Sequence, residues 1–348
     1  MFDEPVSDVA VLIVGYRNPE DIGDCLRALA KSAATPRFDV FICENGGERS
    51  YRRLLDHLRA PAGVCGVGDE GILPPCPPRL IDIECLQLKG RASKVWIGCA
   101  NENLGYAGGV NVWLGPLLAE PNWRGVWILN PDTEPEADAL AALVERAECG
   151  GKGMVGSTIF DTSRPDEVRC RGGLRWERLT ARTTAVGFGE PIRLSRPISA
   201  VEADLDSPSG ASMYVTRACL ETIGCMDERY FLFFEDLEWG VRAKACGVGY
   251  APASMVGHKR GTTTGSANAL ANIPQLTVFL EQRNGILFAR KHFPLSLPAR
   301  IAGSLLYAAR LLAGRAPRNA WTALAGVLAG IRGETGRPTK YLAARSGG

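Results

Sequence analysis

The sequence lacks features that would point to several common function classes. Its 11 cysteines include no Cys-x-x-Cys pair, which excludes zinc-finger spacing. Lys plus Arg (40) nearly balance Asp plus Glu (38), so the formal charge of +2 does not favour a nucleic-acid partner. The chain opens with Asp3 and Glu4, has no apolar signal region, and scatters its cysteines. We therefore expect a cytoplasmic protein that binds no nucleic acid.

Two familiar nucleotide-binding loops are also missing. After the first predicted strand, residues 9–14, a dinucleotide-binding protein would carry Gly-x-Gly-x-x-Gly, but this chain continues with Gly15-Tyr-Arg-Asn-Pro. A P-loop ending in Gly-Lys-Ser or Gly-Lys-Thr does not occur either. These absences exclude dinucleotide binding through a Rossmann turn and nucleoside-triphosphate hydrolysis through a P-loop.

A repeated pattern of strand and helix is present instead. Residues 9–14 are uniformly apolar, as a buried strand is, and residues 19–33 follow with apolar positions at helical spacing. Further strands and helices are predicted at residues 38–43, 51–58, 95–99, 107–118 and 126–129. The alternation predicts an α/β fold with a mostly parallel nucleotide-binding sheet and crossover helices. Residues 60–93, rich in proline and glycine, are predicted to form a surface insertion.

Acidic residues follow two apolar stretches. The run from Tyr230 to Phe234 ends in Glu235 and Asp236, where apolar surroundings would disfavour charged carboxylates. Asp132 comes just after a predicted strand, at the edge where open α/β sheets bind ligands and where a carboxylate suits Mg²⁺ or Mn²⁺. Two simpler interpretations stay open at this point. The pair would then be solvated acids that cap a strand end, and the lone aspartate a helix N-cap.

Short motifs follow one another in a characteristic order. They are VLIVGYRN (11–18), FICENG (41–46), NLGYAGGVN (103–111), LNPDT (129–133), GASM (210–213), GCMDE (224–228), FFED (233–236), His258 and RN (283–284). In this order the chain resembles the family 2 glycosyltransferases of GT-A fold, and most of all their bacterial rhamnosyltransferase branch. The resemblance covers residues 9–294. It implies a GT-A domain over residues 1–294 and a basic helical segment over residues 295–348.

The resemblance implies an inverting, metal-dependent transfer of a sugar from a nucleotide donor. By the family pattern Asp236 is the general base for the acceptor hydroxyl, and Glu235 is a supporting acid. Asp132 would bind Mg²⁺ or Mn²⁺ directly, with Asn130 nearby, and His258 would complete the metal site. A histidine that serves only as a surface or loop residue is the alternative for His258, because magnesium prefers oxygen ligands.

The resemblance also assigns donor-binding residues to two strand ends and a glycine-rich helix start. They are Gly15, Tyr16, Arg17, Glu44, Asn45, Asn103, Gly105, Gly108, Gly109, Asn130 and Arg283. The glycines would let the backbone approach the donor closely, although a plain glycine turn explains them as well. Arg283 would touch the diphosphate or an acidic acceptor, with a helix salt bridge as the alternative. Glu44 and Glu238 depart from the family pattern, which usually has Asp there.

The favoured donor by this resemblance is dTDP-rhamnose, with a UDP-hexose or UDP-N-acetylhexosamine as the closest rival. The acceptor would be a hydroxyl of a glycan or of a lipid-linked saccharide, in the synthesis of a bacterial surface or secondary-metabolite glycan. A non-catalytic nucleotide-sugar-binding relative is the alternative from another class. Retention of Asp132, Asp236 and His258 together argues against it.

The C-terminal segment combines positive charge with apolar residues at helical spacing. No Asp or Glu occurs between Glu281 and Glu334, although Arg is frequent there. Apolar positions over residues 301–312 and 321–331, on either side of Pro317, predict two amphipathic helices. Such helices would lie on an anionic inner leaflet and bring the site to a lipid-linked acceptor. Packing on the catalytic domain, or a homodimer interface, is the alternative.

Overall fold

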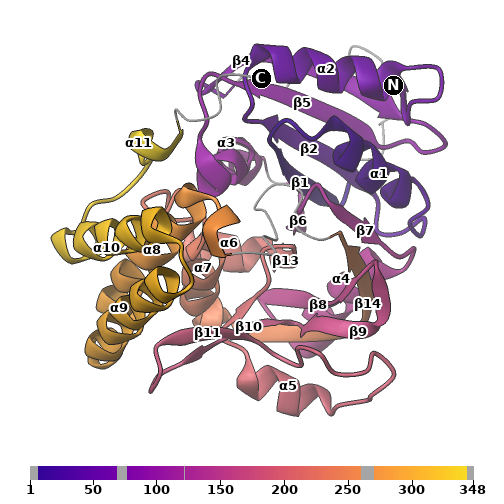
Figure 1. Ribbon diagram of the computed structural model, residues 1–348. Coiled ribbons are helices and arrows are strands. Elements are labelled where there is room, and N and C mark those ends of the chain that lie inside the picture. Colours follow the sequence, from indigo (N-terminus) through magenta and orange to yellow (C-terminus); the bar gives the residue numbers. More distant parts are fainter. Residues whose placement is uncertain (1–6, 69–76, 121, 260–269, 343–348) are drawn as a thin grey trace.

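The computed structural model describes residues 7–68, 77–120, 122–259 and 270–342, and it confirms the α/β class (Figure 1). Its main sheet has 11 strands. Ten follow one path, in the order β3 (Cys65–Val67), β4 (Leu80–Leu88), β5 (Lys94–Ala100), β2 (Phe38–Glu44), β1 (Val9–Gly15), β6 (Gly125–Leu129), β13 (Ser212–Thr216), β8 (Met154–Asp161), β14 (Val248–His258) and β7 (Thr133–Pro135). The eleventh, β9 (Arg164–Arg171), pairs with β8.

Most strands of this sheet run in one direction, as predicted. β1, β2, β3, β5, β6, β8 and β14 point one way, whereas β4, β7, β9 and β13 point the other. The group β5-β2-β1-β6 is parallel throughout. Because the carboxyl ends of these four strands meet at one edge, the residues that follow them are gathered there.

Helices cover both faces of the parallel group, which explains why every residue of β1 is buried. α1 (Pro19–Ala30), α2 (Glu48–Arg59) and α4 (Ala139–Gly150) pack on the face that carries Val9, Val11 and Ile13. α3 (Gly105–Ala119), α6 (Arg217–Ile223) and α7 (Glu235–Ala243) pack on the face of Leu12 and Val14. Strands buried on both faces are continuously apolar, which is the pattern that made them predictable.

Part of the expected surface insertion belongs to the sheet. β4 lies within residues 60–93 and pairs antiparallel with β5, and the short β3 pairs with β4 at the sheet edge. Residues 69–76 of this stretch lie outside the described residues. The prolines between 74 and 78 dominated the sequence interpretation, although Leu80, Leu86 and Leu88 of β4 are buried.

A second, three-stranded sheet stands beside the main one in the order β11 (Arg182–Ala185), β10 (Gly173–Glu177) and β12 (Ser207–Pro208). The short helix α5 (Ile198–Asp204) precedes β12. Trp176 of β10 packs against Phe234 and Phe288, with ring centroids 6.3 Å and 5.0 Å away. This aromatic cluster joins the small sheet to the loop before α7 and to the C-terminal helices.

The C-terminal helices form one packed group, seen at one side of the molecule in Figure 1. They are α8 (Gln275–His292), α9 (Leu297–Ala313), α10 (Pro317–Arg332) and the short α11 (Thr339–Leu342), with 3₁₀ helices at Leu270–Asn272 and Pro294–Ser296. A further 3₁₀ helix, Lys244–Cys246, follows α7. The two predicted amphipathic helices are α9 and α10. Val278 of α8 shares a core with Leu311 of α9 and Ala323 of α10, so the expected boundary at residue 294 falls inside this group. Within the described ranges, no helix has the length and apolar character needed to cross a bilayer.

Candidate active site

A cavity of about 840 Å³ lies at the carboxyl edge of the parallel strands. Tyr16, Asn45 and Asp132, which follow β1, β2 and β6, line one side of it. The other side comes from elements late in the chain: residues 231–237, the first turns of α8, and α11. A cavity of this volume is in the range of small-molecule sites. It brings both predicted acidic groups to one place.

Nine of the residues proposed from the sequence line this cavity. They are Tyr16, Asn45, Asn103, Gly105, Asn130, Asp132, Glu235, Asp236 and His258. The remaining six do not border it: Gly15, Arg17, Glu44, Gly108, Gly109 and Arg283. The structure therefore brings nine of the predicted residues to one cavity, whereas the other six do not border it.

Asp132 and His258 lie together, as expected of two ligands to one ion. His258 ends β14 and pairs in register with Thr133 of β7, the residue after Asp132. His258 Nε2 is 3.0 Å from Asp132 Oδ1, and Arg169 Nη1 is 3.0 Å from His258 Nδ1. An arginine only donates, so Nδ1 of the imidazole accepts, and the proton of the neutral ring is on Nε2. His258 thus donates to the carboxylate of Asp132.

Asp132 and His258 could both bind a divalent ion once Arg169 has moved away from His258. Among the described side chains, no group of three or more His, Cys, Asp and Glu could enclose an ion. Mg²⁺ sites that also hold substrate phosphates need only one or two carboxylates from the protein, and Asp132 supplies one. His258 can act as a ligand through Nε2 only when its proton has left that nitrogen, which requires Arg169 to withdraw from Nδ1.

The loop before the two acids has an unusual backbone. Phe231, Phe233 and Phe234 have φ of 66°, 69° and 73°, in the left-handed region that costs a non-glycine residue roughly 1–3 kcal/mol. Asn284 of α8 holds this loop, because its Nδ2 lies 2.8 to 2.9 Å from three of the loop's carbonyl oxygens. The strained turn directs the start of α7 into the cavity.

Arg283 lies behind this loop and does not reach the cavity. Its side chain is buried, and Nη1 donates to the carbonyl of Gly336 at 2.7 Å while Nη2 donates to that of Tyr230 at 3.1 Å. Burial lowers the pKa of this guanidinium to about 10. The contacts tie the aromatic loop to the C-terminal segment, so Arg283 supports the site and makes neither the helix salt bridge nor the diphosphate contact expected from the sequence.

Asp236 presents its carboxylate to the cavity from the first turn of α7. Oδ2 accepts a hydrogen bond from the backbone N–H of Gly210 at 3.0 Å, and Oδ1 accepts one from that of Leu237 at 2.7 Å. The enclosing protein raises the pKa of this carboxyl, and the two N–H donors act against that rise. A fixed carboxylate with a raised pKa has the properties of a general base.

Glu235 is more deeply buried than its neighbour, with 4% of its surface exposed. Its Oε2 has no hydrogen-bond partner in the described part of the chain. Burial, and then the adjacent charge of Asp236, raise its pKa well above the usual value. Glu235 is therefore a neutral acid when Asp236 is ionised, which matches a supporting role.

Tyr106 was not among the predicted residues, although it stands inside the NLGYAGGVN motif. It lines the cavity, and its hydroxyl lies 3.0 Å from Asn130 Oδ1 and 2.8 Å from the carbonyl oxygen of Gly210. Burial raises the pKa of this phenol well above its usual value, so it stays a donor. It connects the residues beside Asp132 to those beside Asp236.

At the ends of β1 and β2, Glu44 and Asn45 organise the backbone. The buried carboxylate of Glu44 accepts from the N–H groups of Arg17 at 3.2 Å and Gly46 at 2.7 Å, so it joins the loops after β1 and β2. Asn45 Nδ2 donates to the carbonyl of Gly105 at 2.8 Å, at the start of α3. Of these two, only Asn45 borders the cavity and can reach a ligand.

The glycines of α3 serve close packing. Gly105 has φ of 71°, and a Cβ atom there would lie 2.2 Å from the carbonyl oxygen of Phe231, so only glycine fits. A Cβ atom on Gly109 would lie 2.6 Å from Val14 of β1. Gly109 therefore brings the helix close to the sheet, whereas a Cβ atom on Gly108 would meet Leu104, Arg79 and Glu228. Of these three glycines, Gly105 alone borders the cavity.

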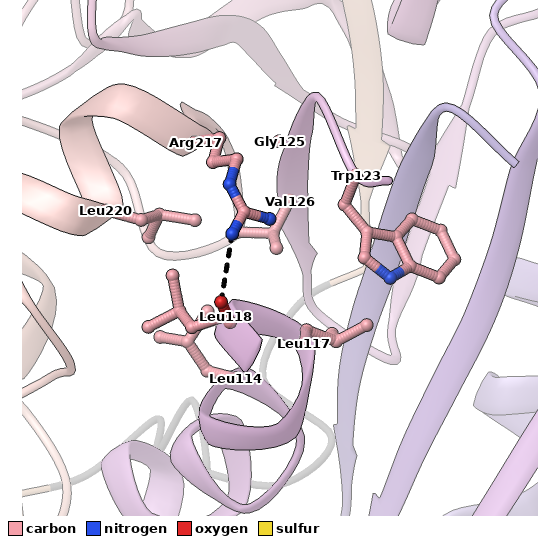
Figure 2. Close-up of a pocket in the computed structure, with 8 residues that line it drawn as sticks. All are labelled: Leu114, Leu117, Leu118, Trp123, Gly125, Val126, Arg217 and Leu220. Carbon is pink, nitrogen blue, oxygen red and sulfur yellow. Dashed lines mark hydrogen bonds between the residues drawn. The ribbon is translucent and has the colours of Figure 1, made fainter. Parts of the chain in front are cut away.

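A second and much smaller cavity, about 10 Å³, lies between α3, β6 and α6 (Figure 2). Its lining is mostly apolar, and Arg217 closes it by donating from Nη2 to the carbonyl of Leu118 at 3.0 Å. This volume holds at most one water molecule. We assign it to imperfect packing.

Comparison with known proteins gives relatives that transfer sugars. The chain is 26% identical over 209 residues to the N-acetylglucosaminyl-diphospho-decaprenol L-rhamnosyltransferase of Mycobacterium tuberculosis, a match that spans 52% of this chain and 65% of that relative, slightly less than two thirds. It is 24% identical over 354 residues to the low-salt glycan biosynthesis hexosyltransferase Agl10 of Haloferax volcanii, over 96% of this chain and 94% of that one.

Among solved structures, the mannosyltransferase PcManGT of Pyrobaculum calidifontis, in complex with GDP-Man and Mn²⁺, has a TM-score of 0.49 and 13% identity, over 94% of this chain and 90% of that one. No family model matches the sequence. In its ordered motifs and its α/β fold the chain is similar to glycosyltransferases of the rhamnosyltransferase type, and the two named relatives support an enzyme of the glycosyltransferase type.

Proposed function

We propose that this protein is an inverting glycosyltransferase that moves a sugar from a nucleoside-diphosphate donor to a hydroxyl of a glycan or lipid-linked acceptor. The observation that carries the proposal is the single cavity lined by Asp132 and His258 on one side and by Glu235 and Asp236 on the other. Sugar transfer needs a neutralised leaving diphosphate and a deprotonated acceptor hydroxyl, and these two pairs match the two needs.

Asp236 is the proposed general base. Its carboxylate faces the cavity and is fixed by two backbone N–H donors, so it can take the proton of an acceptor hydroxyl while the new glycosidic bond forms. Burial and the charge of Asp236 raise the pKa of Glu235, which favours its neutral form beside the general base. Attack from the side of Asp236, opposite the departing diphosphate, inverts the anomeric carbon.

Asp132 and His258 would hold Mg²⁺ or Mn²⁺, which supplies positive charge to the leaving diphosphate. Asn45, Asn103 and Tyr16 line the part of the cavity at the ends of β1 and β2, where open α/β sheets bind nucleosides. Arg169, once it leaves His258, has a guanidinium free to meet a phosphate oxygen, which is the geometry that arginine suits best.

We favour dTDP-rhamnose as the donor and a lipid-linked saccharide as the acceptor. The support is the motif order and the mycobacterial relative, whose name gives rhamnose as the transferred sugar and a diphospho-decaprenol as the acceptor. A UDP-hexose or UDP-N-acetylhexosamine is the rival, and the haloarchaeal relative is named a hexosyltransferase.

The test is a donor panel with the purified full chain. With Mn²⁺ present, dTDP-rhamnose should raise the melting temperature and release dTDP slowly, more than UDP-glucose, UDP-N-acetylglucosamine or GDP-mannose does. A clear preference for a UDP-sugar would overturn the donor assignment alone. Stabilisation by a donor without release of nucleotide, with or without a polyprenyl-diphosphate saccharide as acceptor, would favour a binding protein over an enzyme.

A further inference from the structure

Helices α9 and α10 leave large apolar side chains uncovered. Trp321 is 71% exposed, Leu306 68% and Leu312 58%. The other large apolar residues exposed on these helices are Leu305, Leu328 and Ile331, and Leu295 just before α9 is almost fully exposed. Single exposed apolar residues are common, but seven of them concentrated on two packed helices and the turn before them are typical of an interaction surface.

Arginines accompany these apolar residues, and one of them, Arg332, has an acidic neighbour, Glu334, at 3.8 Å. Arg310, Arg315, Arg318 and Arg332 are all exposed, on or between the two helices. Between Glu281 and Glu334 the sequence contains no acid at all. A helix pair with Trp and Leu beside Arg, and without acidic residues, has the composition of a surface that lies in the headgroup region of an anionic bilayer.

The same helix group forms a wall of the candidate active site. Gln275, Thr277 and Glu281, in the first turns of α8, line the cavity. The adjacent Val278 of α8 packs in one cluster with Leu311 of α9. Because α8 packs on α9, a surface that binds α9 and α10 would hold the cavity at a fixed distance from that surface and in a fixed orientation.

We propose that the face of α9 and α10 that carries Leu306, Leu312 and Trp321 docks on an anionic lipid bilayer. The cavity is then presented to an acceptor whose lipid tail stays in that bilayer. The acceptor part of this inference rests on the proposed function, whereas the docking itself does not.

The charge of this face favours a lipid surface over a second copy of the chain as its binding partner. In a two-fold dimer the same patch would face itself, so that Arg310 and Arg318 would meet the equivalent arginines with no acid of the patch to pair them. An anionic bilayer supplies the missing negative charge. The apolar residues alone suit either occupant, and the arginines favour the lipid.

Flotation with liposomes tests the docking without any turnover. Full chain is mixed with vesicles of phosphatidylcholine alone or with 30 mol% phosphatidylglycerol, at a range of salt concentrations from about 50 to 500 mM, a range over which surface charges become largely screened. We expect binding to the anionic vesicles at low salt that falls steeply as salt rises. The double variant Arg310→Gln, Arg318→Gln should lower the partition coefficient by about fivefold for each charge removed.

Trp321→Glu should lower partitioning by at least about tenfold, because it places a charge where apolar contact is needed. Phe188→Glu is the matched control, since Phe188 is 72% exposed in the turn after β11 and lies outside the two helices. It should bind vesicles as the unchanged chain does. Both variants replace exposed residues, so equal melting temperatures will show that each is folded.

No binding of the unchanged chain to anionic vesicles at low salt overturns the proposal. The proposal is also overturned if Trp321→Glu and Phe188→Glu lose vesicle binding to the same extent. A dimer in mass photometry that Trp321→Glu dissociates, without vesicle binding, would assign the patch to a second copy instead. Nucleotide release from the donor panel is measured separately in solution, so failure of the docking and failure of the proposed reaction can be told apart.

Discussion

The two carboxylate sites that share the cavity lie in opposite surroundings. Asp132 has the imidazole of His258 at 3.0 Å and the guanidinium of Arg169 behind it. Glu235 and Asp236 lie beside aromatic residues at the start of α7, where the hydrogen bonds to Asp236 come from backbone N–H groups. We therefore expect the first site to suit a diphosphate with its ion, because its partners are basic and cationic, and the second to suit proton transfer, because its enclosure is apolar.

The largest effect is expected for Asp236→Asn. Turnover should fall by about 10²-fold or more because the amide cannot accept the proton, while donor affinity stays unchanged. Steady-state kinetics and a binding titration measure the two quantities. Asp56→Asn makes the same chemical change on the exposed side of α2 and should leave both unchanged. Full turnover in Asp236→Asn would remove this residue from the mechanism.

Asn284→Ala should come next, since it frees the strained loop that directs Glu235 and Asp236. We expect kcat to fall about tenfold with little change in the donor KM, and the free energy of unfolding to fall by about 1–3 kcal/mol. Asn319 is a matched control, because its Nδ2 likewise donates to two carbonyl oxygens, at 2.8 and 3.0 Å, in the loop before α8. If Asn319→Ala lowers kcat as much as Asn284→Ala does, the loop has no special positioning role.

The raised pKa of Glu235 predicts a pH dependence of stability. The unfolded chain releases this proton near pH 4, while the folded chain keeps it to higher pH. Stability therefore falls as pH rises through that window, by about 1.4 kcal/mol per pH unit for one group. Glu235→Gln cannot ionise and should have a shallower slope, with the part due to Asp236 remaining. Urea unfolding between pH 4 and 7 measures it, and identical slopes would contradict the assignment.

Tyr106→Phe should have the smallest effect of the series. It removes the hydroxyl that lies 3.0 Å from Asn130 Oδ1 and 2.8 Å from the carbonyl of Gly210, and leaves the ring in place. The loss of one hydrogen bond should lower the free energy of unfolding by about 1 kcal/mol. Thermal unfolding measures this change. A fall in kcat larger than that of Asn284→Ala would show that Tyr106 acts on the substrate directly.

Periodic elements and strand-end acids were predictable from the sequence because their causes are local. Val9 to Val14 is buried on both faces and is therefore apolar throughout, and Asp132 follows a strand of the same kind. β4 was missed because prolines precede it and because its buried residues are irregularly spaced along the strand. A local pattern could not show that Asn284 would meet a loop about 50 residues away in the chain, since that contact depends on how α8 packs.

Glu238 illustrates the same limit at the site. From the sequence it stood where the family usually has a further Asp beside the acidic pair. In the fold it is fully buried, and it pairs with Arg242 at 2.9 Å and Lys291 at 2.7 Å, with His292 at 3.2 Å. These partners overcome burial and hold its pKa down at about 2. Glu238 comes two residues after Asp236 on α7, so its side chain is on the opposite side of the helix and does not border the cavity. The sequence spacing alone did not reveal this orientation.

The division of work between the two carboxylate sites is tested most directly by calorimetry of dTDP binding, with and without Mn²⁺. The unchanged chain and Asp236→Asn should both bind dTDP at least about tenfold more tightly with the metal, because neither alters the corner at Asp132. Asp132→Ala should lose that gain. Equal affinity with and without Mn²⁺ in the unchanged chain, or an equal loss in both variants, would contradict the account.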